Sequence, residues 1–469
     1  MNLGADMDDI AFLGLVEVGR KIQTGEVTSV DVTSHILERI ERLDRRYNSY
    51  ATVISEMAIS AAKTADTEIQ SGKIRGPLHG VPIAVKDLCD TKGILTACGM
   101  PMFQDRIPTE DSTVVSRLRE AGAILLGKLQ MTEGALAMHH PDIVVPVNPW
   151  VNDRWSGASS SGSGVSVAAG LTYGSLGSDT GGSIRFPSLC NGIVGLKGTW
   201  GRVSRSGIFP LSDTLDHVGP MARKVEDVAA ILSVIAGHDA SDPTSLTAKV
   251  PDYLSEIDKG VEGLRVGFDE SYCSNGVNSI ISDAVHSALD SLSKAGAKIV
   301  EFSMPNTDDA VRGWVPLCVA EAVVAHSNTF PSRADEYSDT LRGFLEAGEQ
   351  ISGPEYAQAT IHRKELCGAM QKIHQDVDLI MTLTLPDPIP TVAEFAKIGE
   401  SADAVERLIK YTSIADLTGN PTISLPAGFD GNGAPIGIQF MGSPLSESLL
   451  CRAGYIFQTA RDWSDSKPN

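Results

Sequence analysis

Apolar residues recur with a helical period near the start of the chain. They follow Thr28, which with Asp31 is typical of a helix start, and they continue through residues 30–43. This spacing predicts an amphipathic helix packed on a larger body. An alanine-rich stretch over residues 56–72, stopped by Gly72, predicts a second helix.

The pattern changes between Pro77 and about Gly219, where short apolar runs are broken by glycine and proline. Residues 80–87 (GVPIAVKD) and 123–129 (AILLGKL) are such runs, and a predicted helix over 111–122 leads into the second. The runs lack the strict alternation of a half-exposed strand, which favours strands buried on both faces. The region therefore predicts strands alternating with helices, in a sheet that helices cover on both sides.

The carboxyl-terminal half mixes segments of both kinds. They are, in chain order, a polar surface excursion at 238–245, a strand at 264–270, a helix at 279–296, mostly helices from about 305 to 375, and strands at 420–429 and 435–442 separated by the turn sequence DGNG. No internal repeat and no long polar linker divides the 469 residues. The pattern thus marks no firm domain boundary.

Charge narrows the classes of partner. Lys and Arg total 39 against 59 Asp and Glu, a net charge of −20 that argues against extended contact with nucleic acid or anionic lipid. The amino-terminal segment is acidic where a secretory signal needs positive charge, and no apolar run approaches the ~18 residues of a membrane span. We therefore expect a cytoplasmic protein with no nucleic-acid and no membrane partner.

Cysteine and histidine positions give no support for a metal. The seven cysteines are scattered and form no CxxC pair, so neither a disulfide framework nor a zinc site is indicated. His139 and His140 are adjacent, which would place them on opposite sides of a strand. We expect no metal and no cofactor.

One stretch between residues 157 and 188 is rich in serine and glycine: GASSSGSGVSVAAGLTYGSLGSDTGGSIRFPS. Such composition is typical of flexible linkers. However, this stretch also contains buried-type residues such as Val165, Leu171 and Tyr173, which a solvated linker does not need. An ordered role is therefore favoured.

Ser183 lies where the backbone of this stretch has least bulk, directly after Gly181 and Gly182. Such a position suits a nucleophile, because consecutive glycines let backbone N–H groups turn toward one point. An oxyanion hole requires that arrangement, and one such donor typically lowers a barrier by ~3 kcal/mol.

The base that would activate this serine is not fixed by the residues alone. His217 is a candidate, although a structural histidine is the simpler interpretation because no partner can be assigned to it. Lys86 is another, at the end of an apolar run where burial favours the neutral amine. Lowering a lysine pKa from about 10.4 to near 7 corresponds to about 4 to 5 kcal/mol, which burial can supply.

The serine- and glycine-rich stretch resembles the amidase signature. The matching residues are Gly157-Ala158-Ser159-Ser160-Ser161-Gly162, Gly164, Gly177, Asp179, Gly181, Ser183-Ile184-Arg185 and Pro187-Ser188. Segments such as GPLHGVPIAVKD before it, and GNPTISLPAGF and PIGIQFMG near the end, extend the resemblance over most of the chain.

This resemblance implies a single α/β/α domain over 1–469, in which helices cover a large mixed central sheet. It divides the chain into a helical segment (1–75), a catalytic core (77–220), a mostly helical variable region (240–400) and closing strands with a helix (410–469).

The resemblance also implies a Ser-cisSer-Lys triad. Ser183 would be the nucleophile, Ser159 the bridging serine after a cis peptide bond, and Lys86 the base. The remaining residues that it implicates are the oxyanion-hole amides Thr180, Gly181 and Gly182 in the stretch from Thr180 to Ser183, the supporting residues Asp179 and Arg185, and the acyl-pocket residues Ala135 and Leu136.

The function expected from this resemblance is hydrolysis of a small to medium, uncharged amide through a seryl acyl-enzyme, with esters or carbamates as further substrates. One alternative is the glutaminase subunit of a tRNA-dependent amidotransferase. Such subunits carry glutamine where Phe186 stands, and the segment KGTWGRVSRSG departs from theirs at Gly198, Trp200 and Ser206. Another alternative is a degenerate relative that only binds. The sequence indicates no oligomeric state.

Overall fold

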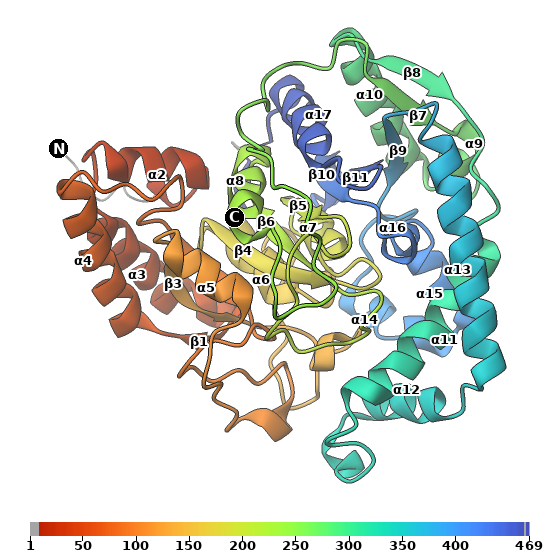
Figure 1. Ribbon diagram of the computed structural model, residues 1–469, viewed down its shortest axis with the longest axis horizontal. Helices are drawn as coiled ribbons and strands as arrows, with labels where there is room; N and C mark the ends of the chain where they lie inside the picture. The colour runs from red at the N-terminus through yellow and green to blue at the C-terminus, as the bar shows by residue number, and fades with distance from the viewer. Residues whose placement is uncertain (1–8, 464–465, 469) are drawn as a thin grey trace.

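An eleven-stranded mixed sheet runs through the part of the chain that the computed structural model describes, residues 9–463 and 466–468 (Figure 1). Its strand order is β1-β3-β2-β4-β6-β5-β10-β11-β9-β7-β8. The strands are β1 (Tyr50–Val53), β2 (Pro82–Lys86), β3 (Ile124–Leu129), β4 (Gly174–Asp179), β5 (Val194–Lys197), β6 (His217–Ala222), β7 (Arg265–Phe268), β8 (Lys298–Glu301), β9 (Leu379–Leu383), β10 (Thr422–Phe429) and β11 (Pro435–Gly442).

Parallel and antiparallel pairs occur in separate parts of the sheet. Strands β3, β2 and β4 are parallel neighbours, and so are β9, β7 and β8. Antiparallel pairs join β4 through β6, β5, β10 and β11 to β9, and β1 pairs antiparallel with β3 at one edge. The expected large mixed sheet is therefore confirmed.

Helices cover both faces of this sheet. They are α2 (Leu15–Gln23), α3 (Ser29–Tyr47), α4 (Ser55–Gln70), α5 (Thr113–Glu120), α6 (Ser161–Ala168), α7 (Arg185–Cys190), α8 (Val225–Ile235), α9 (Glu270–Ser274), α10 (Ser279–Lys294), α11 (Asp308–Ala325), α12 (Asp339–Glu349), α13 (Gly353–Ile373), α14 (Val392–Phe395), α15 (Ala402–Ile409), α16 (Ser413–Thr418) and α17 (Glu447–Ala460). In Figure 1, α11, α12 and α13 lie beyond the sheet on the side away from α2–α4.

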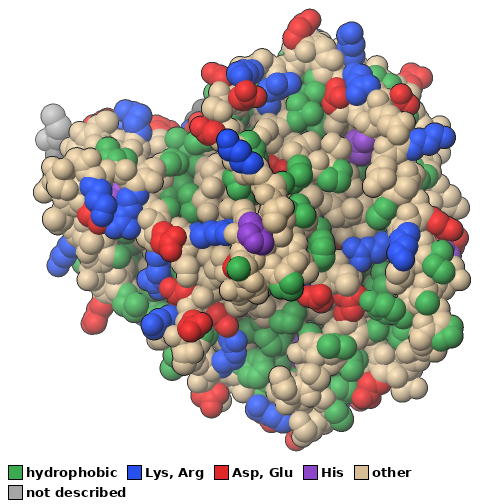
Figure 2. Space-filling view, viewed as in Figure 1, with side chains coloured by type: hydrophobic (Ala, Val, Ile, Leu, Met, Phe, Trp, Pro, Cys, Tyr) green, Lys and Arg blue, Asp and Glu red, His purple; other side chains and the backbone are tan. Residues whose placement is uncertain are grey.

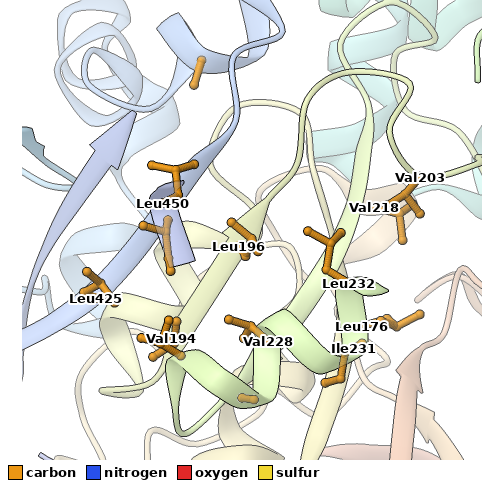
Figure 3. Packing of buried hydrophobic residues seen from close by; sticks show 14 of the residues in the cluster. Leu176, Val194, Leu196, Val203, Val218, Val228, Ile231, Leu232, Leu425 and Leu450 are labelled. Carbon is orange, nitrogen blue, oxygen red and sulfur yellow. The ribbon is translucent and has the colours of Figure 1, made fainter. Parts of the chain in front are cut away.

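Two residues of β6 show which helices cover each face of the sheet. Val218 belongs to the main hydrophobic cluster, on the face where α8 and α17 pack (Figure 3). Met221 points to the opposite face, where it joins Val167 of α6 and Ile184, which precedes α7. Because side chains alternate across a strand, α6 and α7 lie on the face opposite α8 and α17. Each fully buried large apolar side chain contributes about 1.5–3 kcal/mol through its removal from water.

The predicted elements can be compared with these bounds directly. The helix predicted over 30–43 lies within α3, and the four strands predicted at 80–87, 123–129, 420–429 and 435–442 are β2, β3, β10 and β11. The segment 1–75 also contains β1, whose residues alternate between half-buried and exposed at the sheet edge. Such a short, half-exposed strand has little hydrophobic signal, because only one of its faces is covered.

The surface in Figure 2 mixes acidic and basic side chains, without a large patch of one sign on this face. Across the described residues, no helix is long and apolar enough to cross a membrane. All seven cysteines are free, and six of them are buried. Residues 1–8 of the acidic amino-terminal segment lie outside the described residues.

Candidate active site

The carboxyl ends of the parallel strands β2, β3 and β4 meet at one edge of the sheet. Lys86 is the last residue of β2, and Ser178 and Asp179 close β4. All three side chains are buried. Parallel strands end at the same edge, and ligand sites in α/β sheets commonly occur there. The topology therefore brings Lys86 and the serine-rich segment together.

Ser159 lies directly before α6 and faces Lys86. A hydrogen bond of 2.6 Å joins Lys86 Nζ to Ser159 Oγ, and a second of 2.8 Å joins Lys86 Nζ to Ser178 Oγ. The Ala158–Ser159 peptide bond is cis. The preceding Gly157 has a φ of 84°, and a Cβ there would lie 2.4 Å from Pro187 Cα, so only glycine fits.

Burial lowers the pKa of Lys86 to about 7. The Cys89 thiol and the Asp216 and Asp179 carboxyls act in the opposite direction, but their effect is smaller than that of desolvation. A lysine of this kind is neutral for a large part of its time near pH 7, and a neutral amine can accept a proton.

Ser183 lies on the loop between β4 and α7, and its side chain is partly exposed. The preceding Gly182 has a φ of 136°, and a Cβ there would lie 2.4 Å from the Phe186 ring. Among the described residues, no hydrogen bond joins Ser159 to Ser183. The structure thus pairs Lys86 with Ser159, and the second half of the relay, from Ser159 to Ser183, stays a prediction.

Asp179 and Arg185 hold this loop in place through buried hydrogen bonds and an ion pair. Asp179 Oδ1 accepts the Gly182 N–H at 2.6 Å, and its Oδ2 accepts the Ile184 N–H at 3.0 Å. Arg185 Nη2 contacts both Asp179 (3.0 Å) and Asp416 (2.8 Å). Burial by itself would raise the pKa of Asp179, but the adjacent guanidinium outweighs it and holds the pKa well below its usual value. These contacts fit the supporting role expected for both residues.

The backbone amides expected to form the oxyanion hole differ in their partners. The Gly182 N–H donates to Asp179, so it is not free to meet a substrate oxyanion. Within the described residues, the amides of Thr180, Gly181 and Ser183 donate to no other group. Thr180 and Gly181 therefore remain candidate donors, and Ser183 replaces Gly182 as the third.

His217 lies near the site, but its described polar contacts are with backbone carbonyl oxygens and with Asp416. Its Nδ1 lies 2.7 Å from the Leu215 carbonyl oxygen and 3.3 Å from that of Asp179. Burial, assisted by the charge of Lys197, lowers the pKa of His217 well below its usual value. No described contact joins it to Ser183, so Lys86 is the better candidate for the base.

A cavity of about 150 Å³ lies beside this cluster. Its lining includes Ser178 and Ala135, together with apolar residues such as Ile208, Phe209 and Leu211. Leu136, the second expected pocket residue, is not among the lining residues and packs against the main hydrophobic cluster. A cavity of this size accommodates a group comparable to a small side chain or an aromatic ring.

Sequence reasoning missed three residues that contact this site. Ser178 bonds to Lys86, Trp314 donates to the Thr180 carbonyl, and Thr412 donates to the Gly181 carbonyl. Ser178 could have been found, because a parallel pairing of β2 and β4 places it opposite the end of β2. Trp314 and Thr412 lie far away in sequence and carry no local signal.

The chain is similar to known proteins over nearly its whole length. The family model described as Amidase matches residues 31–451. The putative amidase AmiD of Mycobacterium tuberculosis is 42% identical over 466 residues, which cover 99% of this chain and 97% of AmiD. One subunit of the Glutamyl-tRNA(Gln) amidotransferase of Nitrosococcus oceani is 36% identical over 97% of this chain and 98% of its own. The crystal structure of peptide amidase from Stenotrophomonas maltophilia superposes with a TM-score of 0.82 at 28% identity, covering 97% of this chain and 98% of the other.

Proposed function

This chain belongs to the amidase signature family of amide hydrolases, and from that premise we propose that it cleaves the C–N bond of a small, uncharged amide through a seryl acyl-enzyme. The observation that carries the proposal is the buried pair of Lys86 and Ser159, joined at 2.6 Å, with the pKa of the lysine lowered to about 7 by burial. Burying an amine without a carboxylate partner is costly, and a neutral amine hydrogen-bonded to a hydroxyl can accept its proton, which is the use that the proposed reaction makes of this pair.

The first half of the reaction forms the acyl-enzyme. The Oγ of Ser183 attacks the substrate carbonyl carbon and gives its proton to Ser159. At the same time Ser159 gives its own proton to the neutral amine of Lys86. The carbonyl oxygen becomes an oxyanion facing the amides of Thr180, Gly181 and Ser183. The C–N bond then breaks while the proton held by Lys86 returns through Ser159 to the departing amine.

The second half restores the enzyme. Water loses a proton through the same relay and attacks the ester carbonyl at Ser183. The tetrahedral intermediate collapses, the carboxylic acid leaves, and the proton returns to Ser183 Oγ. Esters and carbamates carry the same acyl carbon, so the same steps apply to them.

The cavity beside the triad supports a substrate with an uncharged group of modest size. Its apolar residues Ile208, Phe209 and Leu211 favour an alkyl or aryl group. Arg205 also lines it, but its guanidinium is engaged by Asp213 and Thr244. An anionic substrate group would therefore find no unpaired arginine or lysine in this lining.

A glutaminase that delivers ammonia to a partner is the second candidate function. The similarity to the Nitrosococcus oceani protein over nearly the whole chain favours it. The two functions differ in a measurable way, because a glutaminase releases ammonia from glutamine, whereas the proposed amidase cleaves neutral amides in the absence of any partner.

A substrate panel tests the proposal. The purified chain is assayed with chromogenic anilides, esters, carbamates and glutamine, in parallel with the Ser183→Ala variant. We expect turnover of neutral anilides or esters by the wild type and loss of at least 1,000-fold in Ser183→Ala, as is typical of triad nucleophiles (about 10³ or more). Equal rates for both proteins would overturn the seryl mechanism, and glutamine as the only substrate would favour the second function.

A further inference from the structure

Three successive peptide groups of the loop between Thr180 and Ser183 are each anchored through the carbonyl oxygen. The Thr180 carbonyl accepts the Trp314 indole N–H at 2.8 Å, and the Gly181 carbonyl accepts the Thr412 hydroxyl at 2.6 Å. The Gly182 carbonyl accepts the Phe186 N–H at 2.7 Å. The loop therefore has little freedom to rotate its amides.

The anchor on one carbonyl fixes the direction of the next amide. In a planar trans peptide the C=O and the following N–H point in opposite directions. The Trp314 bond to the Thr180 carbonyl therefore turns the Gly181 N–H away from α11. In the same way, the Thr412 bond to the Gly181 carbonyl turns the Gly182 N–H toward Asp179, where it donates at 2.6 Å.

Trp314 makes two contacts with the same peptide group. Besides the indole hydrogen bond, its ring lies against Gly181, because a Cβ added there would approach the ring to 2.8 Å. The residue is 8% exposed. A bulkier residue at 181 would displace the ring, and a side chain at 314 without the N–H would leave the Thr180 carbonyl without this donor.

Helix α11, which carries Trp314, is itself held in place. Two turns after Trp314, Glu321 accepts hydrogen bonds from Ser212 (2.6 Å) and Thr214 (2.8 Å), which lie in the loop before β6. It also accepts one from Tyr356 of α13 at 2.8 Å. The indole is therefore presented from a fixed helix rather than from a mobile segment.

We propose that Trp314 is a positioning residue, which aims the Gly181 amide at the oxyanion that forms during acyl transfer. This inference rests on the proposed function, since it assigns one residue to the charge-stabilising part of that reaction. Trp314 acts through the Thr180–Gly181 peptide and forms no bond to the substrate oxyanion itself. Its contribution is therefore to the transition state and not to ground-state binding.

The test removes the indole N–H. Trp314→Phe deletes the donor and keeps a smaller aromatic ring at this position. Loss of a whole oxyanion donor costs about 10²–10³ in kcat, so misaiming one is expected to lower kcat by about 10- to 100-fold with KM changed less than about 2-fold. The affinity for a trifluoromethyl ketone, which forms an oxyanion adduct with a serine, should fall by the same factor as kcat/KM.

Trp150→Phe is the matched control. Its indole N–H also donates to a backbone carbonyl at 2.8 Å, that of Asn191, but away from the loop. It should leave kcat and the ketone affinity at wild-type values. Replacing Trp314 by benzothienylalanine, which has the shape of tryptophan without the N–H, separates the lost bond from lost packing if Trp314→Phe folds poorly.

The outcomes separate this inference from the proposed function. If Ser183→Ala abolishes turnover but the benzothienyl variant keeps wild-type kcat and ketone affinity, Trp314 has no positioning role and the inference is overturned. A loss confined to KM, with unchanged ketone affinity, overturns it as well. If Ser183→Ala matches the wild type, the proposed function itself has failed.

Discussion

The pH dependence of turnover follows from the buried amine of Lys86. Burial lowers its pKa from 10.5 to about 7, which corresponds to about 5 kcal/mol in favour of the neutral form. At pH 7 about half of the molecules then carry a neutral Lys86, whereas an ordinary lysine would be neutral in about one molecule in 3,000. The neutral amine that acts as the base is therefore present more than about 1,000 times as often as in an ordinary lysine at this pH.

The expected profile has a single rising limb. If the neutral amine starts the reaction, kcat/KM should fall tenfold for each pH unit below about 6 and level off above about 8. The assay is the initial rate of hydrolysis of a neutral chromogenic anilide between pH 5 and 9.5, because such a substrate does not itself titrate in this range.

A second buried group lies close enough to need a control. Burial raises the pKa of Asp216 to about 6, and its carboxylate accepts a hydrogen bond from Thr180 at 2.6 Å. In the Asp216→Asn variant the limb near pH 7 should persist. A limb that vanishes in this variant, or a wild-type profile that rises only above pH 9, would refute the assignment of Lys86 as the base.

Three further outcomes are expected. Lys86→Met should abolish turnover yet unfold at a higher temperature than the wild type at pH 7, with the gap narrowing toward pH 10. The reason is that the pKa of Lys86 is lower in the folded protein than in the unfolded chain. Between pH 7 and 10.5 the unfolded wild type therefore binds more protons than the folded protein, and this destabilises the folded wild type most at the low end of that range. Ser159→Ala should lower kcat strongly but leave measurable activity; a wild-type rate would contradict the relay. Asp179→Ala should lower the free energy of unfolding by about 3–5 kcal/mol in a urea titration, since it leaves Arg185 with one fewer buried carboxylate; an unchanged midpoint would contradict this.

Much of the sheet could be predicted from the sequence, because its central strands are continuous apolar runs. Residues 80–87 and 123–129 are short, mostly apolar runs, which are typical of strands buried on both faces, and β2 and β3 lie within them. Lys86 could be singled out for the same reason, since it ends a buried run. The short edge strand β1 could not be predicted from the sequence, because the hydrophobic pattern of a half-exposed strand of four residues resembles that of a loop.

The support of the catalytic loop could not be predicted, because it depends on contacts across the fold. Trp314 reaches Thr180 over 134 residues, and Arg185 reaches Asp416 over 231. Such contacts depend on where β10, α11 and α16 are placed in space, which no local period or spacing encodes. The bond from the Gly182 N–H to the Asp179 carboxylate is local in sequence, but its direction depends on the Thr412 anchor of the preceding carbonyl.

The long reach of these anchors bears on how the protein is made. Ser183 leaves the ribosome well before Trp314, Thr412 and Asp416, which fix the loop around it. The strand order adds to this delay, since the late β10 is inserted beside the early β5. A nascent or truncated chain that ends before residue 412 therefore carries Ser183, the proposed nucleophile, without all of its anchors, so we expect hydrolytic competence to arise only as synthesis is completed.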